Sequence, residues 1–214
     1  MPFYFRQVVD FASTVSFIHE LSNGRFRFGI GVSHEPALKA RGISSGKPLE
    51  DTRKFVAELR STPRVGELPP IILAALRTKM INLSEEIAEG MVFANGARSH
   101  MKESLQAISE KARNSADFFI GDMIPTCIND DIKLAKAVNR KTLTSYAYLP
   151  NYRNYWKEAG YREEMEGIEA AISAGDRERV QYFLTDSWLS DTTLFGSASQ
   201  VREGVEAWFD AGIK

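Results

Sequence analysis

The chain has 214 residues, of which 43% are hydrophobic and 26% are charged, a balance that is typical of a folded globular protein. Its 27 Lys and Arg residues nearly balance 28 Asp and Glu residues, and the formal net charge of -1 argues against nucleic acid or an anionic membrane as a partner. A single cysteine, Cys127, excludes an internal disulfide and fits a reducing, cytoplasmic location. No apolar stretch approaches the ~20 residues of a membrane span.

The first part of the chain alternates between helix-like and strand-like patterns. Residues 7–21 carry apolar side chains at helical spacing, and Asn23 and Gly24 supply a left-handed stop. Apolar runs and amphipathic segments then alternate: we predict strands at 25–32, 71–76, 91–96 and 118–128, and helices at 49–59, 77–90 and 98–113. Parallel neighbours need a crossover of about a dozen residues, which a helix fills. The order therefore predicts an α/β protein with parallel strands.

The pattern changes after Asp131. Helical segments at 134–149, 161–175 and 199–212 follow without an apolar strand run between them, which predicts a helical insertion or cap after Asp131. The aromatic residues of 151–161 favour packing over lining the mouth of a site, because aromatic side chains mostly serve cores and interfaces. The chain is shorter than the ~250 residues of an eight-stranded α/β barrel, so it is either an open sheet or part of a barrel.

Functional groups of parallel α/β proteins gather where loops leave the carboxyl ends of the strands. This rule points to four loops, at residues 29–35, 74–78, 95–99 and 126–130. The second and third loops combine small residues with Arg77 or Arg98 near a helix start, which suits a phosphate. His34 follows the first strand and is a candidate acid or base, although a histidine more often has a structural role.

The sequence lacks the motifs that are typical of several classes of enzyme and binding protein. Gly29 and Gly31 lack the third glycine of a dinucleotide fingerprint, and neither a Walker loop nor a nucleophile elbow occurs. His and acidic residues do not recur at ligand spacing on one element, so we predict no metal site. These patterns do not point to acyl transfer or to nucleotide hydrolysis.

Three stretches resemble the bacterial luciferase-like monooxygenase superfamily. They are LSNGRFRFGIGVSHEP at residues 21–36, PPIILAALRTKMINLSEEIAEGMVFANG, and ASQVREGVEAWFDAG. Two segments, ANGARSHM and LPNYRNYWKEAGY, are most similar to sequences of the branch that uses the deazaflavin coenzyme F-420. The resemblance implies a (β/α)8 TIM barrel that binds a reduced deazaflavin, or FMN as second choice, at the carboxyl ends of its strands. When the chain is aligned with the family's barrel in this way, residues 1–214 form one incomplete domain that contains strands four to seven of the barrel. Residues 131–200 then form the helical insertion within this domain.

The resemblance also implies roles for particular residues. His34 falls where some deazaflavin relatives place an acidic proton donor, so it is the predicted general acid. Residues at three strand exits would hold the cofactor, the first pair beneath its ring and the others around its phosphate: Gly31, Ser33, Ala74, Ala75, Leu76, Arg77, Asn95 and Gly96.

The resemblance leaves three functional hypotheses open. The first is a luciferase-like oxidoreductase or monooxygenase that moves a hydride between the reduced cofactor and a small organic substrate. The second is a truncated, non-catalytic flavin-binding or assembly module of the same fold. The third is an unrelated α/β barrel enzyme with generic anion loops. A partial barrel also leaves strand edges open, which predicts a possible homo-oligomer.

Overall fold

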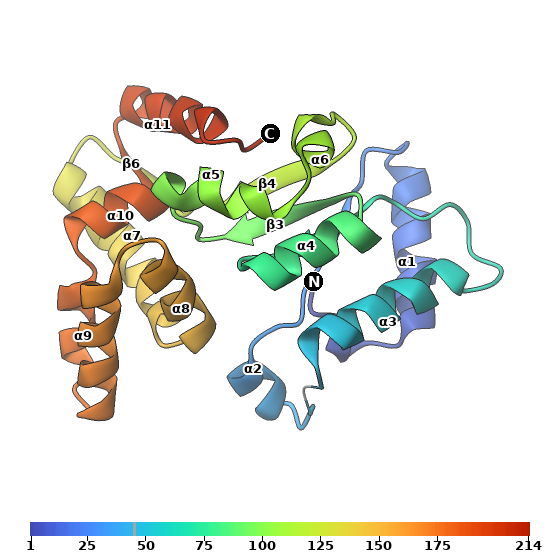
Figure 1. Ribbon diagram of the computed structural model, residues 1–214, viewed down its shortest axis with the longest axis horizontal. Coiled ribbons are helices and arrows are strands. Elements are labelled where there is room, and N and C mark those ends of the chain that lie inside the picture. Colours follow the sequence, from blue (N-terminus) through green and yellow to red (C-terminus); the bar gives the residue numbers. More distant parts are fainter. Residues whose placement is uncertain (45) are drawn as a thin grey trace. The chain divides into compact units, whose positions relative to one another are not determined.

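A computed structural model describes residues 1–44 and 46–214 (Figure 1). The chain forms two compact units. Unit 1 comprises Met1–Phe93 and Gln106–Gly121, and unit 2 comprises Ala94–Leu105 and Asp122–Lys214. Each unit buries large apolar side chains of its own, Phe11 and Leu59 in unit 1 and Trp156 and Trp188 in unit 2.

The sheet of unit 1 has four strands in the order β1-β2-β3-β4. β1 pairs in parallel with β2, with Phe28 opposite Ile71, and β2 pairs in parallel with β3, with Leu73 opposite Met91. The last residues of β3 and β4 belong to unit 2. The strands are β1 Phe28–Ile30, β2 Ile71–Ala74, β3 Gly90–Ala94 and β4 Phe119–Met123.

The helices of unit 1 cover this sheet with apolar stripes. α3 begins at Pro48, and the negative charges of Glu50 and Asp51 stabilise its first turn. Its buried face includes Phe55 and Leu59. α3 lies next to both α1 and α4 (Figure 1). The elements are η1 Phe3–Phe5, α1 Val8–Leu21, α2 Glu35–Lys39, α3 Pro48–Ser61, α4 Thr78–Ile87 and α6 Glu110–Asn114, with η3 Leu105–Ala107 at the boundary between the units.

The first three residues extend the sheet beyond β1. The amino group of Met1 donates to Gly29 O at 2.6 Å, Gly31 N donates to Met1 O at 3.0 Å, and Phe3 N donates to Gly31 O at 3.1 Å. Pro2 forms a parallel bridge with Gly31. These bonds satisfy backbone groups at the outer edge of β1, the edge that was expected to be open.

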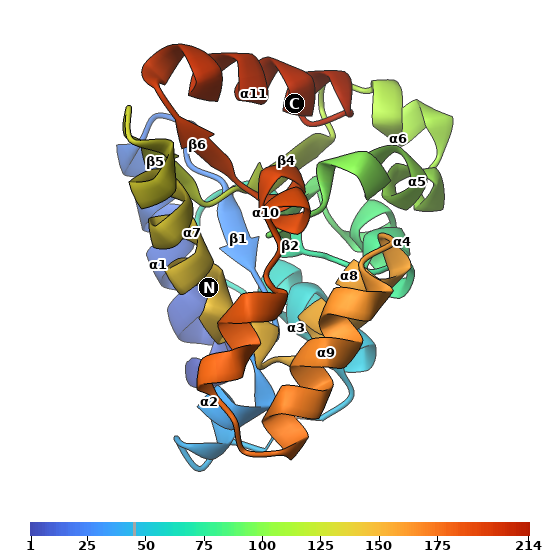
Figure 2. The ribbon, with the colours of Figure 1, turned by 90° about the vertical axis from the view of Figure 1, so that its left-hand side faces the viewer.

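Unit 2 is mostly helical and contains a second, two-stranded sheet. β5 pairs in parallel with β6, with Cys127 opposite Phe195, and α7 and α11 lie beside the pair (Figure 2). The elements are η2 Arg98–His100, α5 Met101–Ser104, β5 Thr126–Ile128, α7 Ile132–Ala147, α8 Pro150–Glu158, α9 Arg162–Ser173, η4 Glu178–Phe183, α10 Asp186–Thr192, β6 Leu194–Gly196 and α11 Ala198–Asp210.

Three boundaries differ from the predictions. The predicted strand at 118–128 is two strands, β4 and β5, because Pro125 cannot donate to a ladder. β6 lies within the region where no strand was predicted, since three residues are too few to form a pattern. The predicted helix at 98–113 is divided into short pieces, and Ser109 caps the last of them by accepting from Ala112 N.

The predicted fold class is confirmed: the chain is an α/β protein with parallel strands and a helical C-terminal part. Within the residues described, the four-stranded sheet does not close into a ring. Tyr152, Tyr155 and Trp156 are buried, which confirms the expectation that the aromatic residues of this segment pack. No helix in the described ranges is long and apolar enough to cross a bilayer.

The close approach of β3 to β4 depends on Gly90. A Cβ on Gly90 would lie 2.7 Å from Phe119 Cβ and 2.8 Å from Phe119 N, whereas a Cβ on Gly29 in β1 would meet no atom within 4 Å. We expect Gly90→Ala to lower the free energy of unfolding by about 1–3 kcal/mol through overpacking. Gly29→Ala is the matched control, and we expect it to change stability by less than about 1 kcal/mol.

Urea denaturation of both variants measures this difference. Equal unfolding free energies for the two variants would contradict the prediction, because they would show that β3 and β4 accommodate a Cβ at position 90 without a loss of stability.

Candidate functional site

The exits of β1 and β2 come together in unit 1. A Cβ built on Gly31 would lie only 3.0 Å from Ala74 Cβ, so the two predicted cofactor residues are in close contact. Ala75 N donates to Val92 O at 3.0 Å, which fixes the start of the second loop. Ser33 adopts a left-handed backbone with φ 66°, an uncommon conformation for a residue other than glycine. The first loop therefore turns sharply after Gly31.

His34 and Arg77 stand before two helices of unit 1. His34 precedes α2 and is half-buried, and this burial lowers the pKa of its imidazole below the ordinary value. The ring is therefore neutral at pH 7, and its protonated form is favoured only at lower pH. Arg77 is exposed and precedes α4, and Leu76 is partly buried beside it.

The exit of β3 lies in unit 2 and contains Asn95 and Gly96. Asn95 is buried in a left-handed conformation with φ 58°, which asparagine tolerates better than most residues. Its backbone N donates to Met123 O at 3.2 Å. Within the described ranges its Nδ2 is buried without a hydrogen-bond partner. A buried amide of this kind is a candidate contact for a ligand or a water molecule.

Side chains hold the rest of this loop. Gly96 N donates to Asp122 Oδ1 at 3.4 Å, and Ala97 N donates to Tyr155 Oη at 3.0 Å. Ser99 donates to Asp191 from its backbone N at 2.9 Å and from Oγ at 2.7 Å. The loop at 95–99 is thereby bonded to β4, α8 and α10 within unit 2.

Asp122 has the most strongly perturbed carboxyl group of this loop cluster. Burial raises its pKa from 3.8 to about 7, although the backbone N–H groups of Gly96 and Met123 act in the opposite direction. Its Oδ2 atom is buried and has no partner in the described part of the chain. Burial, with a smaller effect of the charge of Asp122, raises the pKa of the Tyr152 and Tyr155 phenols. Asp122 therefore titrates near neutral pH.

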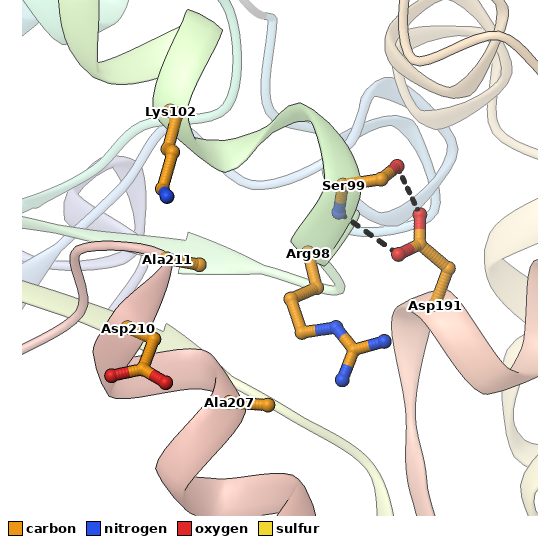
Figure 3. A pocket seen from close by; sticks show the side chains of 7 residues that line it. All are labelled: Arg98, Ser99, Lys102, Asp191, Ala207, Asp210 and Ala211. Atoms are coloured by element: carbon orange, nitrogen blue, oxygen red, sulfur yellow. Dashed lines mark hydrogen bonds between the residues drawn. The ribbon is translucent and has the colours of Figure 1, made fainter.

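A pocket of about 290 Å³ borders the same loop (Figure 3). Arg98 and Lys102 contribute cationic groups, and Asp191 and Asp210 contribute carboxylates, so the lining carries both signs of charge. The lining residues are Arg98, Ser99, Lys102, Asp191, Ala207, Asp210 and Ala211. Among the residues described, no group of three or more His, Cys, Asp and Glu residues is placed to hold a metal ion.

The predicted site residues divide between the units. His34 and six of the predicted cofactor residues belong to unit 1, and Asn95 and Gly96 belong to unit 2. The structure brings Gly31 to Ala74. The sequence interpretation missed Asp122 because the predicted fourth strand ran on to residue 128 and moved its expected exit to 126–130. Tyr155 and Asp191 were missed because their bonds to the loop span 58 and 92 residues of sequence.

Parallel strands connected by helices define the α/β class of protein, in which ligands commonly bind at the carboxyl ends of the strands. A family model described as luciferase-like monooxygenase matches residues 51–214. The chain belongs to this luciferase-like monooxygenase family. A 5,10-methylenetetrahydromethanopterin reductase of Methanolobus tindarius is 25% identical over 130 residues, 51% of this chain and 39% of that protein. The chain thus matches well under half the length of this curated relative.

Solved structures share the fold at low sequence identity. The coenzyme F-420 dependent tetrahydromethanopterin reductase from Methanopyrus kandleri has a TM-score of 0.73 and 16% identity, over 98% of this chain and 72% of that chain. An F-420-dependent secondary alcohol dehydrogenase, in complex with an F-420-acetone adduct, has a TM-score of 0.68 and 13% identity, over 98% and 68%. EDTA monooxygenase from Chelativorans sp. BNC1 has a TM-score of 0.65 and 12% identity, over 99% and 65%.

The titration of Asp122 predicts a pH-dependent cost to folding. Because the folded pKa is raised, the folded state keeps a proton that the unfolded state releases as the pH rises from about 4 to about 7. Stability from this group therefore falls over that window and stays low above it. Each unit of pKa is worth about 1.4 kcal/mol, so we expect Asp122→Asn to gain about 1–3 kcal/mol over the parent chain between pH 5 and pH 8.

Urea denaturation of the parent chain and the variant at both pH values measures this gain. Asp117→Asn, the same change at an exposed residue two positions before β4, is the control and should show no such gain. A pH-independent difference between Asp122→Asn and the parent chain would contradict the assignment.

Proposed function

We propose that the chain is a deazaflavin-dependent oxidoreductase that transfers a hydride between reduced coenzyme F-420 and a small organic substrate, with FMN as the second choice of cofactor. The observation that carries this proposal is the meeting of two parallel strand exits at Gly31 and Ala74, whose side chains are only a hydrogen atom and a methyl group. Gly31 is partly exposed and Ala74 is exposed, and such small residues allow a flat ring system to approach the backbone closely. Membership of the luciferase-like monooxygenase family and the fold shared with F-420-dependent enzymes support the same cofactor.

The residues present fit such a cofactor. Gly31 is partly exposed and has no side chain to cover its backbone, and the buried Nδ2 of Asn95 is a donor without a partner among the described residues. When bound, the reduced ring supplies the hydride. The chain would bind and orient it: Gly31 and Ser33 beneath the ring, with the phosphate held by Ala74, Ala75, Leu76 and Arg77 and by Asn95 and Gly96.

The chemistry of the phosphate loops agrees with this assignment. Small residues allow an anion to approach the backbone after β2, and α4, a helix of ten residues, begins directly after Arg77 with its free N–H groups. The guanidinium of Arg77 is suited to a phosphate because it offers a fork of donors. We therefore propose Arg77 as the main charged contact of the cofactor.

His34 is the proposed general acid. A protonated imidazole beside the first loop would hold a proton at one ring nitrogen and deliver it to the substrate atom that gains negative charge. Because burial lowers its pKa, the proton-donating form becomes scarcer as the pH rises through that value. The proposed acid role therefore favours the acidic side of neutrality.

The remaining proposals concern the organisation of the protein. We propose that residues 1–214 are part of a single luciferase-like barrel domain in which 131–200 form the helical insertion. A cytoplasmic location and a homo-oligomer stay predictions. Val9, Phe17 and Leu21 are exposed on one face of α1, and such a face is consistent with association between copies.

Titration of the chain with coenzyme F-420 and with FMN tests the cofactor proposal, with absorbance and fluorescence as readouts. We expect F-420 to bind more tightly than FMN. Gly31→Val adds bulk where only 3.0 Å separates a Cβ from Ala74, so we expect it to weaken binding at least tenfold; Gly29→Ala is the control, with no atom within 4 Å of the added Cβ, and should bind as the parent does. If neither cofactor binds the parent chain, the proposal is wrong.

His34→Gln tests the acid role separately. We expect this variant to bind the cofactor within about twofold of the parent but to oxidise the reduced cofactor at least a hundredfold more slowly with organic acceptors, the scale of general acid catalysis. The parent rate should fall as the pH rises, and the variant should lose that dependence. Cofactor binding without turnover in the parent itself would favour the non-catalytic module instead.

A further inference from the structure

Every residue of the loop at 95–97, and Ser99 after it, has a backbone group bonded to a residue elsewhere in unit 2. The carbonyl of Asn95 accepts from Trp156 Nε1 at 3.1 Å, and Ala97 N donates to Tyr155 Oη at 3.0 Å. Ser99 N donates to Asp191 Oδ1 at 2.9 Å. Tyr155 and Trp156 are adjacent in α8, and Asp191 lies in α10. The loop therefore takes its shape largely from helices that follow it by more than fifty residues.

The helices that supply these side chains are themselves fixed. Glu169 of α9 accepts from Arg153 Nε at 3.2 Å and from Lys157 Nζ at 2.6 Å, and these two cations flank the bonding pair on α8. The indoles of Trp156 and Trp188 meet edge to face, with ring centroids 4.8 Å apart. α8 is thus joined to α9 by two ion pairs and to α10 by the contact of the two indoles.

Asp191 has further bonds that fix its carboxylate. Its Oδ2 accepts from Ser99 Oγ at 2.7 Å and from Tyr161 Oη at 3.0 Å, while its Oδ1 accepts from Ser99 N. The residue is buried, with an exposed fraction of 7%. A carboxylate with all of these donors has little freedom to rotate, so Ser99 is held firmly.

The loop needs such bonds because its own backbone is unfavourable. Asn95 is left-handed, a conformation that costs an L-residue about 1–2 kcal/mol and persists only when the surroundings enforce it. Asn95, Gly96 and Ala97 are buried, so each polar backbone group without a partner would add a desolvation cost. Bonds from Trp156 and Tyr155 remove that cost only in the observed arrangement.

We propose that α8 and α10 position the loop at 95–99 for cofactor binding, with Tyr155, Trp156 and Asp191 as positioning residues. This inference rests on the proposed function, in which Asn95 and Gly96 hold the cofactor. The helical segment would then act on affinity without contacting the cofactor, by fixing the backbone that does.

Two conservative variants test this role against a matched control. Trp156→Phe removes the Nε1 donor to Asn95 O, and Tyr155→Phe removes the acceptor of Ala97 N. Trp208→Phe is the control, because this indole of α11 is also buried but makes no hydrogen bond to the loop within the described ranges. Each protein is measured as the full chain for F-420 affinity, for urea stability and for hydrogen exchange at the Ala97 amide.

We expect both test variants to bind F-420 about tenfold more weakly, the scale of one lost buried hydrogen bond, with the control within twofold of the parent. Tyr155→Phe should also speed exchange at the Ala97 amide, and partial recovery of affinity in Tyr155→His, which restores a polar ring, would add support. Parent-like affinity in Tyr155→Phe despite faster exchange would overturn the proposal, as would equal weakening in Trp208→Phe.

The parent chain distinguishes the two possible failures. If it binds F-420 and the variants bind equally well, positioning fails while the proposed function stands. If the parent binds neither F-420 nor FMN, the proposed function fails, and positioning for a cofactor fails with it.

Discussion

Parallel pairing of the strands is the constraint on which the site depends. Because β1 and β2 run in the same direction, their carboxyl ends lie at one edge of the sheet, and the residues that follow these two strands become neighbours without any further contact. The register of Ile30 with Leu73 then brings Gly31 against Ala74, where only small residues fit. The small size of both residues at this contact is therefore a consequence of sheet geometry, whatever ligand the strand exits bind.

Periodicity was sufficient for the elements that repeat over a turn or more. α1 and α3 were predicted to within a few residues, because a buried stripe and a clear stop mark each of them. Short elements were not predictable in this way. β6 has three residues and owes its place to pairing with β5, and the broken helix after Arg98 depends on bonds made by Ser109 and Asp191, so neither leaves a local pattern.

The candidate site shows the same division between local and distant causes. Gly31, Ala74 and Asn95 were nominated because strand exits can be recognised from short apolar runs followed by small residues. Asp122 was hidden inside a predicted strand, and the raised pKa of its carboxyl comes from burial that only the folded chain creates. The contacts of Tyr155 and Trp156 with the loop are long-range, and no spacing rule connects α8 with the exit of β3.

The left-handed backbone at Asn95 has a consequence for how this sequence can change over time. Glycine would satisfy the torsion angle at this position but would carry no amide, and most other residues would strain the turn. Aspartate tolerates the torsion but replaces the amide donor with a carboxylate. Two independent constraints therefore act on position 95, one from the backbone torsion and one from the side-chain amide, so few substitutions at this position are neutral.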